Sequence, residues 1–121
     1  MFLFVLLLAS IALGVLGQIS LKFGMNSVGK IELSDIFSLK AFSIVTQKYV
    51  FLGLVSYVFA SLLWLVVISQ EELSYVYPLI GIGYIFVAIL SKLFFNENLT
   101  VLRLFGILLI STGAYLVIAR I

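Results

Sequence analysis

Long apolar runs separated by short polar breaks dominate the hydropathy pattern of this chain. A helix needs roughly 20 residues to cross a bilayer, and four runs reach about that length: Phe2–Leu21, Tyr49–Ser69, Leu73–Phe95 and Leu99–Ala119. In hydrocarbon every backbone amide needs a partner within the protein, and a helix supplies it internally. The pattern therefore predicts an all-α membrane protein, with four transmembrane helices forming one domain over residues 1–121.

The links between these runs predict how neighbouring helices are arranged. Gln70–Glu72 ("QEE") and Asn96–Asn98 ("NEN") are very short, which forces the helices that they join to be antiparallel. The first link, residues 22–48, is longer and contains "LSDIFSLKAFSIV", with Ser34 as a candidate N-cap. Two interpretations stay open for it, a helix lying at the membrane surface and an early start of the second span, and we favour the second.

Composition excludes several classes of function. Hydrophobic residues make up 64% of the chain and charged residues only 10%, whereas a soluble domain carries roughly 25% charged residues. Cysteine and histidine are absent, so disulfides, thiolate nucleophiles and the commonest metal ligands are excluded. The five carboxylates all lie in links. We therefore expect no enzyme activity, no catalytic residue, no metal or other cofactor, and no nucleic-acid partner.

Basic residues are distributed unequally between the two sides of the predicted bundle. One face carries only Arg120, and the other carries Lys22, Lys30, Lys40, Lys48, Lys92 and Arg103. Because basic loops stay on the cytoplasmic side, we expect both termini to lie outside the cytoplasm. We expect the chain itself to span the cytoplasmic (inner) membrane of a bacterium or archaeon. No basic segment precedes the first run, and that run is too long for a signal peptide's apolar core. We expect it to remain as a span.

Polar side chains near the end of the first run are candidates for ligand contact. Gln18 and Lys22 are four residues apart and so share one helix face. A buried amide is costly unless it is paired, so Gln18 either bonds another helix or meets a ligand. Lys22, Lys92 and Arg103 all fall at the same ends of their helices. They either extend to the lipid headgroups or attract an anionic substrate.

The third run begins with "SYVYPLIGIG", which predicts a bend. Pro78 removes a backbone donor, and Gly81 and Gly83 follow it closely. Tyr77 and Tyr84 are seven residues apart, so they lie on one face of the helix. Because a tyrosine hydroxyl in a membrane needs a polar partner, we expect this face to point inward, beside a hinge at Pro78, Gly81 and Gly83.

The fourth run carries glycines at helical spacing. Gly106 and Gly113 are seven residues apart, and small residues on one face allow close helix contact. We expect these two glycines to form an oligomer contact, although packing within one subunit explains the pattern equally well.

These motifs together resemble the small multidrug resistance superfamily of transporters. The resemblance lies in "LGQISLKFG", "YPLIGIG" and "GILLISTGAYLV", in this order. Within the superfamily the chain is most similar to the four-helix subunits of undecaprenyl-phosphate-aminoarabinose flippases. The matching positions are Gly17, Gln18, Lys22, Trp64, Tyr77, Pro78 and Glu97. The resemblance implies a small antiparallel bundle that works as a dimer.

One departure separates this chain from the drug exporters of the superfamily. Those exporters carry a glutamate in the first helix that binds protons and cationic substrates, and the matching position here is Gly14. A glycine cannot titrate, so the resemblance disfavours proton-coupled export of cations. Lysine and glutamine suit an anionic or hydroxylated headgroup better.

The resemblance and the residues together imply a function. We expect a transporter subunit that flips a polyprenyl-phosphate-linked sugar, or a similar lipid-linked glycan precursor, across the membrane. The expected substrate contacts are Gln18, Lys22, Trp64, Tyr77, Tyr84, Lys92 and Arg103. The unbalanced charge further favours a fixed orientation and a heterologous partner of opposite orientation. Two alternatives stay open, an exporter of small metabolites or drugs and a non-transporting assembly subunit.

Overall fold

The structure, a computed structural model, describes residues 2–119, and all regular secondary structure in these residues is helical. Its elements are α1 (Phe2–Val28), α2 (Leu33–Ile36), α3 (Lys40–Thr46), α4 (Lys48–Gln70), α5 (Leu73–Val76), the 3-10 turn η1 (Tyr77–Leu79), α6 (Ile80–Phe95) and α7 (Val101–Ala119). Four helical segments are long and apolar enough to cross a membrane: α1, α4, the α5–η1–α6 segment and α7. The predicted fold class is confirmed.

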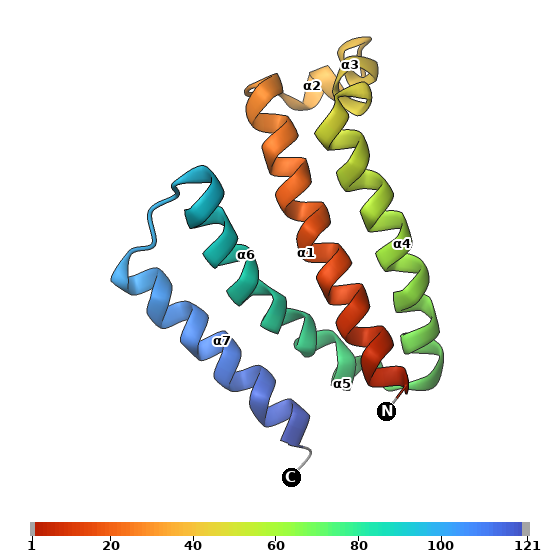
Figure 1. The fold of residues 1–121 in the computed structure, drawn as a ribbon, viewed down its shortest axis with the longest axis vertical. Helices are drawn as coiled ribbons and strands as arrows, with labels where there is room; N and C mark the ends of the chain where they lie inside the picture. Colours follow the sequence, from red (N-terminus) through yellow and green to blue (C-terminus); the bar gives the residue numbers. More distant parts are fainter. Residues whose placement is uncertain (1, 120–121) are drawn as a thin grey trace.

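The four spans form two pairs (Figure 1). The helix α1 runs beside α4 along most of its length, and α6 pairs with α7. The two pairs meet near α5 and diverge toward the opposite end, where α2, α3 and the α6–α7 link lie. We call this second end the basic end, because six basic residues belong to the helix ends and links located there: Lys22, Lys30, Lys40, Lys48, Lys92 and Arg103.

The first helix is longer than the apolar run that predicts it. It continues past Leu21 to Val28 and ends at Gly29, whose φ of 94° is left-handed. Glycine adopts this conformation without steric cost and commonly terminates helices. Lys22 therefore lies within α1, on the turn after Gln18, and not in a link.

The helix α7, which is the fourth predicted span, begins two residues later than predicted, at Val101. The hydroxyl Oγ1 of Thr100 accepts a hydrogen bond of 3.1 Å from the backbone N–H of Arg103, as an N-cap side chain does. The helix α6 ends at Asn96, which has a left-handed φ of 54°. Asparagine tolerates this conformation better than most residues, so the "NEN" link reverses the chain within a few residues.

The long first link does not form an early start of the second span, so the interpretation favoured from the sequence is wrong. Two separate short helices, α2 and α3, precede α4. The helical backbone is interrupted at Gln47, which has an extended ψ of 133°. The side-chain oxygen Oε1 of Gln47 accepts hydrogen bonds from the backbone N–H groups of Tyr49 (2.8 Å) and Val50 (2.9 Å). This cap starts a new helix at Lys48. The side chains of Phe37 and Leu39 are 83% and 92% exposed, which suits a segment lying at the membrane surface.

Small residues bring α1 and α4 close together. A Cβ added to Gly53 would lie 2.8 Å from the backbone oxygen of Gly17 and 2.7 Å from Cγ of Leu21. The hydroxyl of Ser20 donates to the backbone oxygen of Tyr49 at 2.6 Å. Small residues that admit close backbone approach are typical of helix contacts in membranes, so α1 and α4 form a closely packed pair.

Replacing Gly53 with alanine should therefore destabilise the protein by about 1–3 kcal/mol, the usual cost of forcing a methyl group into a packed contact. The measurement is the unfolding midpoint of the solubilised chain in a denaturing detergent. Gly14→Ala is the matched control, because Gly14 also lies within a membrane helix and a Cβ added there meets nothing within 4 Å. Equal midpoints for both variants would contradict the close α1–α4 contact.

Candidate functional site

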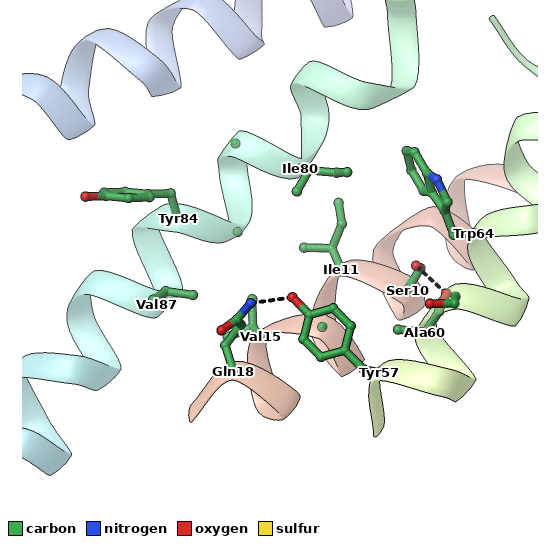
Figure 2. A pocket seen from close by; sticks show the side chains of 14 residues that line it. Ser10, Ile11, Val15, Gln18, Tyr57, Ala60, Trp64, Ile80, Tyr84 and Val87 are labelled. Atoms are coloured by element: carbon green, nitrogen blue, oxygen red, sulfur yellow. Dashed lines mark hydrogen bonds between the residues drawn. The ribbon is translucent and has the colours of Figure 1, made fainter. Parts of the chain in front are cut away.

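A cavity of about 510 Å³ lies between α1, α4 and α6 (Figure 2). Its polar lining side chains are Ser10, Gln18, Tyr57, Ser61, Trp64 and Tyr84. None of the lining residues is Asp, Glu, Lys or Arg. The cavity is thus an uncharged, partly open space with aromatic walls and a few hydrogen-bonding groups, bordered by three apolar helices.

Gln18 and Tyr57 meet across the α1–α4 contact at the edge of the cavity. The amide nitrogen Nε2 of Gln18 donates a hydrogen bond to the Tyr57 hydroxyl. Figure 2 shows the amide oxygen directed away from Tyr57, toward α6. Gln18 therefore bonds another helix, which is one of the two interpretations left open by the sequence, and it also lines the cavity. Its contact with a ligand stays a prediction.

Ser10 and Trp64 lie toward the other side of the cavity (Figure 2). The Ser10 hydroxyl donates to the backbone oxygen of Ala60 at 2.9 Å, and Ser10 is buried. This bond satisfies the hydroxyl and ties α1 to α4, so Ser10 serves packing. The ring of Trp64 meets that of Tyr77 edge-on, with centroids 6.2 Å apart. Tyr77 does not line the cavity but supports a residue that does.

The three basic residues assigned to the substrate lie outside the cavity lining. Lys22 and Lys92 form no ion pair with any described residue, and Nη1 of Arg103 donates to the backbone oxygen of Asn98 at 3.1 Å. All three belong to the basic end, where α1 and α6 finish and α7 begins. The predicted substrate contacts therefore fall in two places, an uncharged cavity and a charged end.

The predicted hinge residues divide between the bend and the cavity wall. Pro78 lies in η1, the 3-10 turn that interrupts the third span. Gly81 and Gly83 line the cavity. A Cβ added to Gly83 would lie 3.1 Å from Cγ2 of Ile11 and 3.3 Å from Cγ2 of Val15. Gly83 thus marks the place where α6 crosses α1.

The two glycines of α7 face open space among the residues that the structure describes. A Cβ added at Gly106 or Gly113 meets nothing within 4 Å. Of the most hydrophobic stretch of α7, only 6% is buried, against 22% for α1. Packing inside one subunit therefore does not explain these glycines.

Sequence reasoning missed Tyr57 and Ser61, although a pattern pointed to both. Tyr57, Ser61 and Trp64 follow one another at intervals of four and three residues, which places them on one helix face. Trp64 was singled out from the sequence. Following its helix face back along α4 leads to Ser61 and then to Tyr57, which contacts Gln18.

Four helical segments long and apolar enough to span a membrane, with an uncharged, aromatic-walled cavity between three of them, define a small multi-pass membrane protein. No protein-family model and no solved structure matches the chain. A protein of Proteus mirabilis, named a probable 4-amino-4-deoxy-L-arabinose-phosphoundecaprenol flippase subunit ArnF, is 34% identical over 91% of this chain and 86% of its own length. The protein of the same name from Photorhabdus laumondii is 32% identical over 91% of both chains.

A third relative carries a different subunit name. The probable flippase subunit ArnE of Pseudomonas fluorescens is 27% identical over 92% of both chains. These likenesses extend over nearly the whole chain, not one motif. The chain therefore belongs to the family of 4-amino-4-deoxy-L-arabinose-phosphoundecaprenol flippase subunits, and the resemblance drawn from its sequence motifs is confirmed.

Proposed function

We propose that this protein is one subunit of a flippase that carries a polyprenyl-phosphate-linked sugar across the bilayer. The observation that supports this most is the division of the site into an uncharged cavity and a basic end. A sugar needs hydrogen-bond partners and tolerates aromatic walls, whereas a phosphate needs positive charge. The two places match the two parts of such a headgroup.

The sugar occupies the cavity in this proposal. Gln18, Tyr57 and Ser61 offer donors and acceptors to its hydroxyls, and Trp64 and Tyr84 offer ring faces. Because no carboxylate lines the cavity, no acid there repels the neighbouring phosphate. The polyprenyl tail stays in the hydrocarbon, so only the polar head has to be shielded during passage.

The phosphate is gathered at the basic end by Lys22, Lys92 and Arg103. Lys22 lies on the α1 turn after Gln18, so a head whose sugar reaches Gln18 leaves its phosphate close to that lysine. Lys22 and Lys92 are exposed and form no ion pair with a described residue, which leaves both charges available to an anion.

A direct flipping assay tests the proposal. Proteoliposomes containing the chain and its partner subunit receive a fluorescent polyprenyl-phosphate sugar, and the label reachable from outside is followed with time. We expect passage faster than in empty liposomes, and slower passage with Gln18→Ala, at a matched amount of folded protein. Passage equal to that of empty liposomes, for the complete complex, would contradict the proposed function.

The partner is a second small subunit with the opposite orientation. Relatives of this chain carry two different subunit names, ArnF and ArnE, and the basic residues of this chain favour one orientation. The uncovered glycines Gly106 and Gly113 supply the contact face on α7. In this proposal the chain spans the inner membrane of a bacterium or archaeon, and both termini lie on the side away from the cytoplasm.

Compartment-specific reporters fused to the ends of the chain test this orientation. We expect activity only from fusions to the reporter that works outside the cytoplasm, and none from fusions to the cytoplasmic reporter. Exchanging Lys22, Lys30 and Lys40 for glutamine should produce mixed signals, because it weakens the charge bias. Equal signals from both compartments in the unaltered chain would contradict a fixed orientation.

A further inference from the structure

An apolar groove of about 420 Å³ lies between α1, η1, α6 and the end of α7. None of the described residues that line it carries a polar side chain. Leu7, Val15 and Leu79 are buried and form its floor, whereas Phe4 and Phe86 are exposed and form its rim. The groove therefore has a packed floor and an open side.

The groove and the uncharged cavity lie on opposite sides of the line where α6 crosses α1. Ile11 and Val15 belong to both linings, and a Cβ added to Gly83, at the crossing, would meet these same two side chains. The other polar or small residues of α1 in the cavity lining, and the other residues of α1 beside them in the groove lining, form two sets: Ser10, Gly14 and Gln18 for the cavity, and Leu8, Ala12 and Leu16 for the groove. At about 100° per residue, the two sets point to opposite sides of Ile11 and Val15.

The basic end lies where the gap between α1 and α6 widens (Figure 1). On α1, Lys22 comes one turn after Gln18, which lines the cavity. On α6, Lys92 comes two residues after Leu90, which lines the groove. A phosphate held by these two exposed lysines would stand above the crossing, with the cavity on one side of it and the groove on the other.

We propose that the groove binds the isoprenoid tail of the transported lipid while the sugar of the same molecule occupies the cavity. This inference rests on the proposed function and adds a second binding site to it. The lipid straddles the crossing of α1 and α6, with its phosphate at the basic end. A tail without polar atoms matches a lining without polar side chains.

The length of the groove favours a long tail over the acyl chain of an ordinary phospholipid. Its lining extends along α1 from Leu16 back to Phe4, which is about 18 Å at the helical rise. From Lys22 to Phe4 the same rise gives about 27 Å, nearly the whole hydrocarbon core of roughly 30 Å. An acyl chain anchored at the basic end fills only about half of that core, whereas a polyprenyl tail is long enough to reach the far end of the groove.

The proposed oligomer contact on α7 leaves the groove uncovered. Ile118 is the contribution of α7 to the groove lining. Gly113 precedes it by five residues and Gly106 by twelve, so both glycines point about 120–140° away from it around the helix. A partner packed on these glycines therefore leaves the open side of the groove to lipid.

Blocking the groove tests the proposal. Ala12 lines the groove and is exposed, so Ala12→Phe places a ring in the groove without replacing a buried residue. The probes are a polyprenyl phosphate and geranyl phosphate, whose two isoprene units reach no further than the start of the groove. Their dissociation constants are measured in nanodiscs that hold the full-length chain with its partner subunit, and empty nanodiscs correct for partition into lipid.

We expect Ala12→Phe to weaken binding of polyprenyl phosphate about tenfold and to leave binding of geranyl phosphate unchanged. Lipid is as apolar as the groove, so the preference for the groove comes from packing contacts and from the attachment of the tail to a bound phosphate. Val58→Phe is the matched control, because Val58 is 59% exposed and lines neither the cavity nor the groove. It should change neither affinity.

A polyprenyl phosphate with a photoreactive group in the middle of its tail provides a second measurement, made on the unaltered chain. We expect label on groove residues such as Leu16 and Phe86, and competition by unlabelled polyprenyl phosphate. Phosphatidylcholine with the same group on an acyl chain should label the groove much less.

Three results would overturn the inference: equal weakening of both probes by Ala12→Phe, equal effects of Ala12→Phe and Val58→Phe, or equal labelling of the groove by phosphatidylcholine. Each of them is compatible with passage of the sugar-lipid in the flipping assay, so the tail site can fail while the proposed function stands. Specific labelling of the groove without any passage would contradict the proposed function and leave the tail site standing.

Discussion

Replacing Gly14 with glutamate should abolish passage of the sugar-lipid while leaving the fold intact. Gly14 lines the cavity, and a Cβ added there meets nothing within 4 Å. The longer side chain therefore enters the cavity without pushing the helices apart. Its carboxylate would stand in a space that otherwise lacks charge and would repel the phosphate of the incoming head. We expect at least a hundredfold loss of passage at neutral pH, which corresponds to about 2.7 kcal/mol.

Gly14→Gln separates the effect of charge from that of bulk. Glutamine has nearly the same shape as glutamate but carries no charge, so it should cost much less passage. Lowering the pH protonates the introduced carboxylate, so passage by the glutamate variant should rise toward that of the glutamine variant in acid. The glutamate variant should also gain affinity for organic cations. Identical losses for both variants at every pH would mean that the cavity responds only to volume.

Neutralising three residues of the basic end should weaken capture of the sugar-lipid about a hundredfold. The change is Lys22→Gln, Lys92→Gln and Arg103→Gln in one chain. Each basic residue near a membrane surface contributes about 1 kcal/mol of attraction to anionic lipid, and the three contributions together give roughly this factor. Salt should weaken binding by the unaltered chain and have less effect on the variant, because exposed charges are screened.

A second triple variant provides the matched control. Lys30→Gln, Lys40→Gln and Lys48→Gln removes the same number of charges from the same side of the membrane. These lysines lie around the long first link, where Lys40 already pairs with Asp35 at 3.8 Å and Lys48 lies over the ring of Tyr49. We expect a much smaller loss of capture. Equal losses in both triple variants would show that only the total charge matters and that Lys22, Lys92 and Arg103 form no particular phosphate site.

The spans could be predicted from the sequence because lipid imposes a simple rule on chain length and polarity. The apolar runs predicted four membrane helices, and the structure has four segments that fit. Helix ends were predicted less well, because local side chains set them. The helix α1 continues seven residues past Leu21, to Val28, where Gly29 terminates it. Gln47 caps α4, so that the preceding residues form separate helices.

The cavity could be predicted only in part. Gln18 and Tyr84 were singled out because polar side chains are conspicuous in apolar runs, and Trp64 was singled out through the family resemblance. All three line the cavity. Tyr57 was not predicted as a cavity residue, because a membrane helix is apolar on its lipid-facing side as well as on its packed side. Hydrophobic periodicity then does not reveal which face of α4 meets α1.

The charged residues were assigned to the same place as Gln18 for a related reason. Lys22 shares a helix face with Gln18 in the sequence, but spacing gives direction and not depth. The structure places the lysine one turn beyond the amide and outside the cavity lining. The separation of an uncharged cavity from a basic end therefore emerged only from the three-dimensional arrangement.

Photolabelling tests the central claim, that the cavity receives the sugar, most directly. A polyprenyl-phosphate sugar with a photoreactive group on the sugar ring is irradiated in membranes containing the full complex, and the labelled peptides are sequenced. The account predicts label on the cavity residues of α1, α4 and α6, around Gln18, Tyr57 and Tyr84, and competition by unlabelled sugar-lipid. Label confined to the outer face of α7, or spread over all lipid-facing surfaces without competition, would contradict it.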